Sequence, residues 1–235
     1  MSSEFFQMLA RRLVASSVPV PTAGLYSFLN PHSYSVLRNE PEIIRSLDGV
    51  FVDGLGASLL LSAICLRRIH RVSFDSTSLA PAIFTQCADL GRSIAFVGGT
   101  DGELRAALRV LQDQFPRLAI VLASHGFFRA PVDELTVMQE IVRKQPEVLV
   151  VGMGTPLQER FLLKVRDLGW RGLGFSCGGY LCQMAKGSFY YYPKWIDRLQ
   201  LRFLYRFVCE PHIRRRYLTT YPIAAAEMLK DRFYW

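Results

Sequence analysis

The chain has 235 residues, 50% of them hydrophobic and 20% charged, which excludes a disordered protein and allows a sizeable core. Its formal net charge of +8 at pH 7 favours anionic partners such as phosphorylated ligands, nucleic acid or an acidic membrane surface. The sequence predicts neither a signal peptide nor a membrane-spanning helix, because no apolar run approaches the ~20 residues that a bilayer requires.

Short apolar strands alternate with helices through the first four fifths of the chain. Strands are expected at 25–30, 50–53, 93–98, 118–123, 147–152 and 172–176, and helices at 57–68, 100–115, 134–144 and 155–168. Helices of this length between short buried strands predict an α/β fold with a Rossmann-like, doubly wound parallel sheet.

Two helix starts carry recognisable local signals. Thr100 and Glu103 have the spacing of a capping box, in which each side chain binds the backbone N–H of the other residue. Pro156 is expected in the first turn of the helix that it opens, where its missing N–H does no harm.

The alternation stops at a tyrosine-rich turn, residues 190–193, and a basic, aromatic segment follows. Residues 189–235 hold 13 of the 29 aromatic residues, 9 of the 28 Lys and Arg and only 4 Asp and Glu, giving +5 of the +8 charge. We therefore predict a Rossmann-like α/β domain, residues 1–192, and a C-terminal helical appendage, residues 193–235. Arg198, Arg202 and Arg206 recur every four residues on an expected helix over 195–208, either as a solvated face or as a contact for phosphate and lipid headgroups.

The expected strand ends carry residues suited to phosphate binding. In a doubly wound sheet, ligands lie beyond the carboxyl ends of the strands, where glycines let backbone N–H groups approach phosphate oxygens. Any one of these glycines is more often a tight turn, and the chain contains neither GxGxxG nor GxxxxGK[ST], which disfavours a dinucleotide fold or a P-loop. The candidates are Asn30, Asp53, Gly54, Gly98, Gly99, Gly126, Gly154, Gly178 and Gly179.

For several polar side chains, the sequence allows either a functional or a structural role. Asp75 lies in a short polar turn before an apolar helix, so it is either a general base or part of an Asx turn. Asp53 is also a helix-cap candidate, and Glu159 a first-turn acid favoured by the helix dipole. His125 and Cys177 read as core residues. The five cysteines lack CxxC spacing, which indicates reduced cytosolic thiols.

The order of the motifs is more specific than any one of them. They run FLNP (28–31), VDG (52–54), the Asp75 segment, VGG (97–99), HGFF (125–128), GMGTPLQE (152–159), CGG (177–179), PKW (193–195), LYRF (204–207) and EPHIRRRY (210–217). This series, which covers residues 30–217, resembles the WecG/TagA/CpsF family of bacterial glycosyltransferases, family 26.

The resemblance implies an inverting transfer of a sugar from a UDP-sugar to a polyprenyl-diphosphate-linked saccharide during synthesis of a bacterial surface polysaccharide. It implies a Rossmann-like fold with a C-terminal appendage, no cofactor and no metal. The protein is then expected in the cytoplasm, peripheral on the inner face of the plasma membrane, with anionic lipid but not nucleic acid as a partner. Self-association is left open.

The resemblance also assigns roles to individual residues. Asp75 takes the role of general base, because it is the only carboxylate in the segment 71–79 that matches the family's aspartate motif. Gln158 and Glu159 of the P-x-QE element join the donor-binding candidates. Residues assigned to the acceptor or the membrane are Trp195, Arg206, Arg214, Arg215 and Arg216.

Two other classes of protein explain part of the sequence. A non-catalytic, membrane-peripheral or nucleotide- or nucleic-acid-binding protein would account for the charge and the aromatics, but not for glycines at successive strand ends. An oxidoreductase with a nucleotide cofactor would account for the glycines. Binding of UDP, duplex DNA or NAD(P) would distinguish the three.

Overall fold

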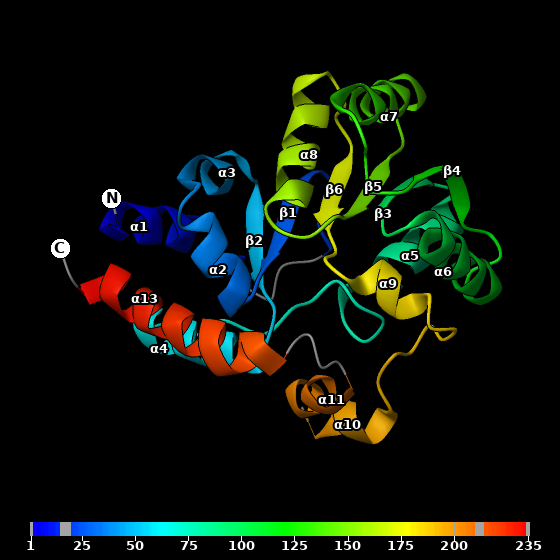
Figure 1. Ribbon diagram of the computed structural model, residues 1–235. Coiled ribbons are helices and arrows are strands. Elements are labelled where there is room, and N and C mark those ends of the chain that lie inside the picture. Colours follow the sequence, from blue (N-terminus) through cyan, green and yellow to red (C-terminus); the bar gives the residue numbers. More distant parts are fainter. Residues whose placement is uncertain (1, 15–19, 200, 210–213, 234–235) are drawn as a thin grey trace. The chain divides into compact units, whose positions relative to one another are not determined.

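The structure is a computed structural model that describes residues 2–14, 20–199, 201–209 and 214–233. Six strands and the helices around them make up the described part of the chain (Figure 1). In chain order the elements are α1 (Ser2–Arg12), β1 (Gly24–Leu29), α2 (Pro31–Leu37), α3 (Pro41–Ser46), β2 (Gly49–Val52), α4 (Leu55–Cys65), α5 (Leu79–Leu90), β3 (Ser93–Gly98), α6 (Asp101–Gln114), β4 (Ala119–Ser124), α7 (Pro131–Lys144), β5 (Val148–Gly152), α8 (Leu157–Asp167), β6 (Leu173–Ser176), α9 (Tyr180–Met184), α10 (Lys194–Arg198), α11 (Arg202–Cys209), the π-helical turn η1 (Arg216–Thr220) and α13 (Tyr221–Phe233).

The six strands form one parallel sheet in the order β2-β1-β6-β5-β3-β4. Val148 of β5 pairs with Leu173 of β6 on one side and with Ile94 of β3 on the other. The four residues of β6 and the five of β5 are all buried, as expected for strands covered on both faces. The GMGTP and CGG motifs therefore follow the two central strands, where the predicted α/β sheet is expected to bind its ligand.

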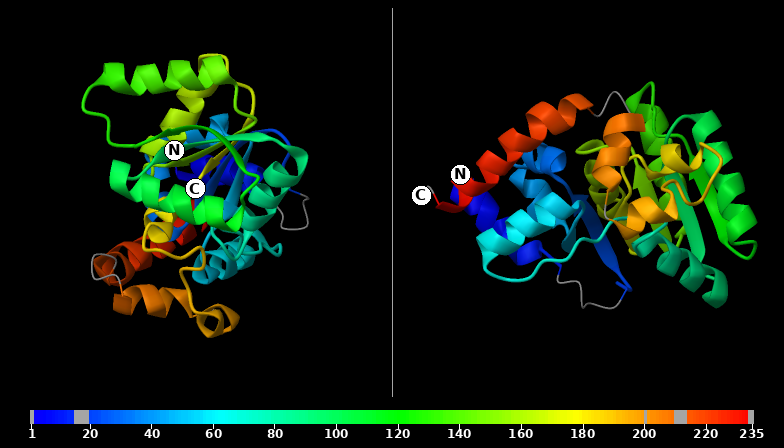
Figure 2. Two further views of the ribbon diagram at one scale, coloured as in Figure 1. Left: turned by 90° about the vertical axis from the view of Figure 1, so that its right-hand side faces the viewer. Right: turned by 90° about the horizontal axis from the view of Figure 1, so that it is seen from below.

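The chain divides into two compact units. Unit 2 consists of residues 19–27 and 74–191. Its helices lie on both faces of its strands, with α7 packed against α8 and α6 against α9 (Figure 2). Phe96, Phe175 and Trp170 are fully buried in its core, where burial of each large aromatic side chain contributes about 1.5–3 kcal/mol.

Unit 1 consists of residues 1–18, 28–73 and 192–235, so it joins the first and last parts of the sequence. Helix α13 packs against α1, α2 and α4 and buries Ala224 and Met228 completely. The ring of Phe5 in α1 meets the ring of Tyr34 in α2 edge-on, with centroids 5.5 Å apart. The C-terminal helix is thus part of the core of this unit.

The strand predictions are confirmed to within about one residue, whereas several helix boundaries differ. The helix expected over 57–68 ends at Cys65, because Leu66 adopts a left-handed conformation with φ of 52°. The helix expected from 134 begins at Pro131, and Pro156 is the N-cap of α8 rather than part of its first turn. Helices α1, α2, α3 and α9 were not predicted.

The basic stripe expected on one helix over 195–208 is wrong. Arg198 ends α10, whereas Arg202 and Arg206 belong to α11, so two separate helices carry the three arginines. The first four residues of the EPHIRRRY motif, 210–213, lie outside the described residues. In the described part of the chain, no helix is long and apolar enough to cross a bilayer.

Candidate functional site

The turn after β3 is shaped by close packing between strand ends. Gly98 has φ of +151°, and a Cβ atom there would overlap the carbonyl oxygen of Gly152 at the end of β5. A Cβ atom on Gly126 would lie 2.8 Å from the side chain of Met153, and the N–H of Gly126 donates to the carbonyl of Gly99 over 3.0 Å. The packing of unit 2 therefore already explains glycine at 98 and 126.

The N-terminus of α6 is capped by the chain's own side chains. Glu103 Oε2 accepts hydrogen bonds from the backbone N–H and the hydroxyl of Thr100, each over 2.8 Å, and Thr100 Oγ1 accepts from the N–H of Glu103. These bonds, first the one from the backbone N–H of Thr100, lower the pKa of Glu103. The predicted capping box is confirmed, and a carboxylate occupies the place where a phosphate would bind.

The turns after β5 and β6 differ from the turn after β3 because space is open above their glycines. Among the described residues, and apart from the two chain neighbours of each glycine, no atom lies within 4 Å of a Cβ built on Gly154, Gly178 or Gly179. Gly154 and Gly178 need positive φ angles of 78° and 54°, but Gly179 has an ordinary φ of −86°. Neither backbone conformation nor packing within the described residues requires glycine at 179, which is consistent with close approach of a ligand to this turn.

Gln158 joins these two turns. Its Oε1 accepts a hydrogen bond from the N–H of Gly178 over 3.0 Å. Its Nε2 donates to Thr155 Oγ1 over 3.2 Å and to Glu159 Oε1 over 2.9 Å. One side chain at the start of α8 thus fixes the turn after β6 relative to the turn after β5.

Glu159 is fully buried, which its position in a first helical turn does not predict. Its Oε1 also accepts from Ser27 Oγ over 2.7 Å, and Ser27 Oγ in turn accepts from Ser176 Oγ over 3.0 Å. Its Oε2 has no hydrogen-bond partner among the described residues. Burial raises the pKa of Glu159, which favours the protonated acid. This carboxyl group ties together residues of β1, β6 and α8.

Asp75 forms an Asx turn. Its Oδ1 accepts from the N–H of Thr77 over 2.9 Å and from Thr77 Oγ1 over 2.7 Å. The segment lies against Tyr180, which directly follows Gly179: the ring of Phe74 meets the Tyr180 ring edge-on at 5.9 Å, and the Tyr180 hydroxyl accepts from Ser76 Oγ. Burial first, and the charge of Asp75 in addition, raise the pKa of Tyr180. Asp75 is therefore close to the Gly178–Gly179 turn within unit 2.

In unit 1, the candidate Asn30 caps α2. Asn30 Oδ1 accepts from the N–H of Ser33 over 3.0 Å, and the N–H of Asn30 donates to Ser33 Oγ over 2.8 Å. His32 follows in the first turn of α2. Burial first, and then the charge of Arg216, lower the pKa of His32, whose Nδ1 is buried without a hydrogen-bond partner in the described part of the chain.

Asp53 is paired with an arginine from outside its own element. Arg71 Nε lies 3.7 Å from Asp53 Oδ1, and the following Gly54 has φ of +101° with open space at its Cβ position. Burial first, and then the neighbouring Tyr217, raise the pKa of Tyr221; the charge of Asp53 adds to this rise, whereas the charge of Arg206 opposes it. Nothing in the local sequence spacing of Asp53 and Arg71 reveals this ion pair.

The predicted acceptor and membrane residues of unit 1 have unlike surroundings. Trp195, Arg215 and Arg216 are exposed. Arg214 is exposed as well, but it donates from Nε and Nη2 to the carbonyl oxygens of Phe207 and Val208, over 2.8 and 2.9 Å, and so binds the C-terminal end of α11.

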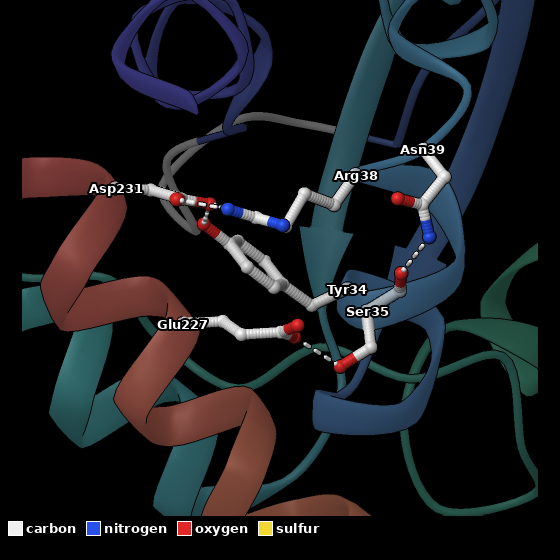
Figure 3. Close-up of polar contacts among 6 residues, drawn as sticks. All are labelled: Tyr34, Ser35, Arg38, Asn39, Glu227 and Asp231. Atoms are coloured by element: carbon white, nitrogen blue, oxygen red, sulfur yellow. Dashed lines mark hydrogen bonds and ion pairs between the residues drawn. The ribbon is translucent and has the colours of Figure 1, made fainter. Parts of the chain in front are cut away.

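A polar cluster holds α13 against α2 (Figure 3). Arg38 binds both carboxylate oxygens of Asp231, and the hydroxyl of Tyr34 donates to Asp231 Oδ2 over 2.9 Å. Ser35 Oγ donates to Glu227 one helical turn earlier in α13. The sequence does not reveal this cluster.

In the described residues, no group of three or more His, Cys, Asp or Glu side chains is placed to hold a metal ion.

Comparison with known proteins identifies the family. Residues 4–234 match the family described as "Glycosyl transferase WecG/TagA/CpsF family". The "UDP-Gal:alpha-D-GlcNAc-diphosphoundecaprenol beta-1,4-galactosyltransferase" of Shigella boydii is 31% identical over 199 residues, 85% of this chain and 83% of the relative. The "N-acetylglucosaminyldiphosphoundecaprenol N-acetyl-beta-D-mannosaminyltransferase" of Bacillus subtilis (strain 168) is 22% identical over 215 residues, 88% of this chain and 80% of the relative. The resemblance in motif order is confirmed, and the chain belongs to the WecG/TagA/CpsF family of glycosyltransferases.

Proposed function

We propose that the protein transfers a hexose or N-acetylhexosamine from a UDP-sugar to a polyprenyl-diphosphate-linked saccharide, during synthesis of a bacterial surface polysaccharide. The names of its relatives, which describe a UDP-galactose donor and diphosphoundecaprenol-linked substrates, support this assignment. The structural observation that carries it is the open turn at Gly178 and Gly179. This turn ends a central strand, is held by Gln158 and lies beside the Asp75 segment.

The turns after β5 and β6 are the proposed site for the donor diphosphate. Gly154, Gly178 and Gly179 leave room above the backbone, whereas the turn after β3 is filled by packing and by the Glu103 carboxylate. Backbone N–H groups and arginines can stabilise the negative charge that develops on the departing UDP.

Asp75 is the proposed general base. Thr77 holds Asp75 by two hydrogen bonds to Oδ1, and in this proposal the carboxylate takes the proton of the acceptor hydroxyl. As the hydroxyl oxygen forms its bond to the anomeric carbon, the bond from that carbon to the phosphate oxygen breaks, and its electron pair leaves with UDP. Asp53, paired with Arg71 at the end of β2, is the alternative base.

The C-terminal segment is the proposed contact for the acceptor's diphosphate and for the membrane. Exposed Arg215, Arg216 and Trp195 supply cationic and aromatic groups of the kind that bind at anionic membrane surfaces. Such attachment would place the enzyme on the cytoplasmic face of the plasma membrane, where lipid-linked saccharides are extended.

The proposal is tested by incubating the purified protein with a panel of UDP-sugars and a polyprenyl-diphosphate-linked N-acetylglucosamine acceptor. We expect one donor to yield a longer lipid-linked saccharide with release of UDP, and UDP to stabilise the protein against thermal unfolding. Stabilisation by NAD(P) or duplex DNA but not by UDP, with no transfer from any donor, would contradict the proposal.

A further inference from the structure

Helix α4 is apolar on the side that faces solvent as well as on the side that faces the core. Ala57, Leu61 and Ile64 are buried in unit 1. The opposite side presents residues spaced by three or four, which we call the outer face of α4. Its members within the helix are Leu55, which is 42% exposed, Leu59, which is 62% exposed, and the exposed Ala63. Leu66, which is 88% exposed, follows directly as the C-cap residue and extends the face beyond the helix. A helix that is apolar all round normally contacts an apolar partner on each side.

The segment that carries the outer face has basic but no acidic side chains. The sequence contains no Asp or Glu between Asp53 and Asp75, and α4 itself carries no charged residue. Exposed Arg67 and Arg68 follow Leu66 directly. Arg67 Nη2 donates to the carbonyl of Ala10 over 2.8 Å, which holds this guanidinium at the C-terminal end of the outer face.

Helix α13, which neighbours α4, also exposes apolar and basic residues. Helices α13 and α4 pack against one another in unit 1 (Figure 1). Exposed residues of α13 recur at helical spacing as Ile223, Ala226, Lys230 and Phe233, so its solvent side is also apolar and basic.

We propose that the outer face of α4 is a second membrane-contacting surface, which inserts its leucines into the headgroup boundary of an anionic bilayer while Arg67 and Arg68 bind lipid phosphates. Exposed leucines bordered by arginines, without acidic residues, match the apolar and negatively charged layers of such a surface. A second copy of the chain is a poorer match, because it would bring the same basic surface against itself without a carboxylate on α4. The inference rests on the proposed function only in that the acceptor substrate is anchored in a membrane.

The test compares a double variant, Leu59→Ser with Leu66→Ser, with a matched control, Leu90→Ser. Leu90 of unit 2 is 61% exposed at the end of α5, so it loses the same side chain from a similarly exposed place outside α4. Cosedimentation is measured with vesicles of phosphatidylcholine alone and of phosphatidylcholine mixed equally with phosphatidylglycerol, without any sugar substrate. We expect the double variant to bind the mixed vesicles about 10-fold more weakly than the parent, and the control to bind like the parent.

Further measurements distinguish a membrane contact from misfolding and from dimerisation. Circular dichroism and transfer to a detergent-solubilised acceptor should be unchanged in the double variant, because neither leucine is among the residues of the proposed donor site or the proposed base. Unchanged vesicle binding by the double variant would overturn the inference, whether or not sugar transfer is ever detected. It would also be overturned if sedimentation showed a dimer that the two substitutions dissociate, with vesicle binding intact.

Discussion

Arg38 and Asp231, which lie 193 positions apart, form a bidentate ion pair with distances of 2.6 Å from Nε to Oδ2 and 2.8 Å from Nη2 to Oδ1. The Asp231 side chain is fully buried, whereas the Arg38 side chain is 25% exposed. Tyr34 donates a third hydrogen bond to the same carboxylate, and burial together with this charge raises the pKa of Tyr34. A deletion of the whole C-terminal segment would therefore also remove part of the core of unit 1.

Replacing Asp231 with Asn should destabilise unit 1 without touching the proposed donor site. The substitution leaves Arg38 without its carboxylate, so we expect the free energy of unfolding to fall by about 2–4 kcal/mol in urea titrations. Glu227→Gln, which alters only the contact to Ser35, should cost about 1 kcal/mol. If the two variants lost the same free energy of unfolding, the buried ion pair would contribute no more to stability than the contact between Glu227 and Ser35.

Local sequence patterns predict the strands and the class of the sheet, because each strand is a short apolar run and each crossover helix has its own periodicity. They do not predict that Asp231 pairs with Arg38 or that Ser27 donates a hydrogen bond to Glu159, because these partners are far apart in sequence. The break between α10 and α11 has no signal either, since no Gly or Pro stands between Arg198 and Arg202.

The glycine candidates looked alike in the sequence, and the structure separates them physically. Gly98 is required by the close approach of Gly152, whereas nothing in the described residues requires glycine at 179. Gly179→Ala should therefore fold with parental stability. If a phosphate approaches this backbone, the added methyl group should weaken UDP binding about 10-fold or more, measured by calorimetry.

Gly98→Ala should behave differently from Gly179→Ala, because it should destabilise the fold. Its Cβ atom would overlap backbone atoms, and φ of +151° strains any residue other than glycine, so we expect loss of stability before any effect on affinity can be read. Parental UDP affinity in a well-folded Gly179→Ala protein would show that the phosphate does not lie over this turn.

The buried Glu159 should make stability depend on pH. Because burial raises its pKa in the folded state, the folded protein holds this proton more tightly than the unfolded chain. Its contribution to stability is complete below the ordinary pKa of 4.5 and is lost as pH rises through the raised value. Glu159→Gln cannot ionise, so the stability of this variant relative to the parent should increase with pH over that window, as measured by urea unfolding.

Glu103 provides a control, because its pKa is shifted in the opposite direction to that of Glu159. Its pKa is lowered by hydrogen bonds from Thr100, so its contribution is present above the ordinary value and is lost as pH falls through the lowered one. Glu103→Gln should therefore lose its difference from the parent towards acid pH. A flat stability difference for Glu159→Gln from acid to neutral pH would mean that folding does not raise the pKa of Glu159.

The choice between two carboxylates is decided by kinetics. Asp75→Asn should keep the Asx turn, because its side-chain oxygen can still accept from Thr77, and should leave UDP affinity unchanged. If Asp75 is the base, kcat should fall by about 10²- to 10⁴-fold. If Asp75→Asn instead retains turnover within a few-fold of the parent and Asp53→Asn does not, Asp53 is the base.

The exposed arginines of the C-terminal segment should control attachment to charged lipid. Arg215 and Arg216 are exposed, whereas Arg214 binds the end of α11, so we expect the double variant Arg215→Ala with Arg216→Ala to remain folded. Each basic group near an anionic surface contributes about 1 kcal/mol, so binding to phosphatidylglycerol-containing vesicles should fall by about 10- to 30-fold at low salt. High salt should abolish the difference from the parent, because counterions screen the charges of both proteins.

The matched control is the double variant Arg105→Ala with Arg109→Ala, which removes two charges from α6 in unit 2. If this control loses as much vesicle binding as the tail variant, attachment depends on total charge, and the C-terminal segment is not the membrane contact.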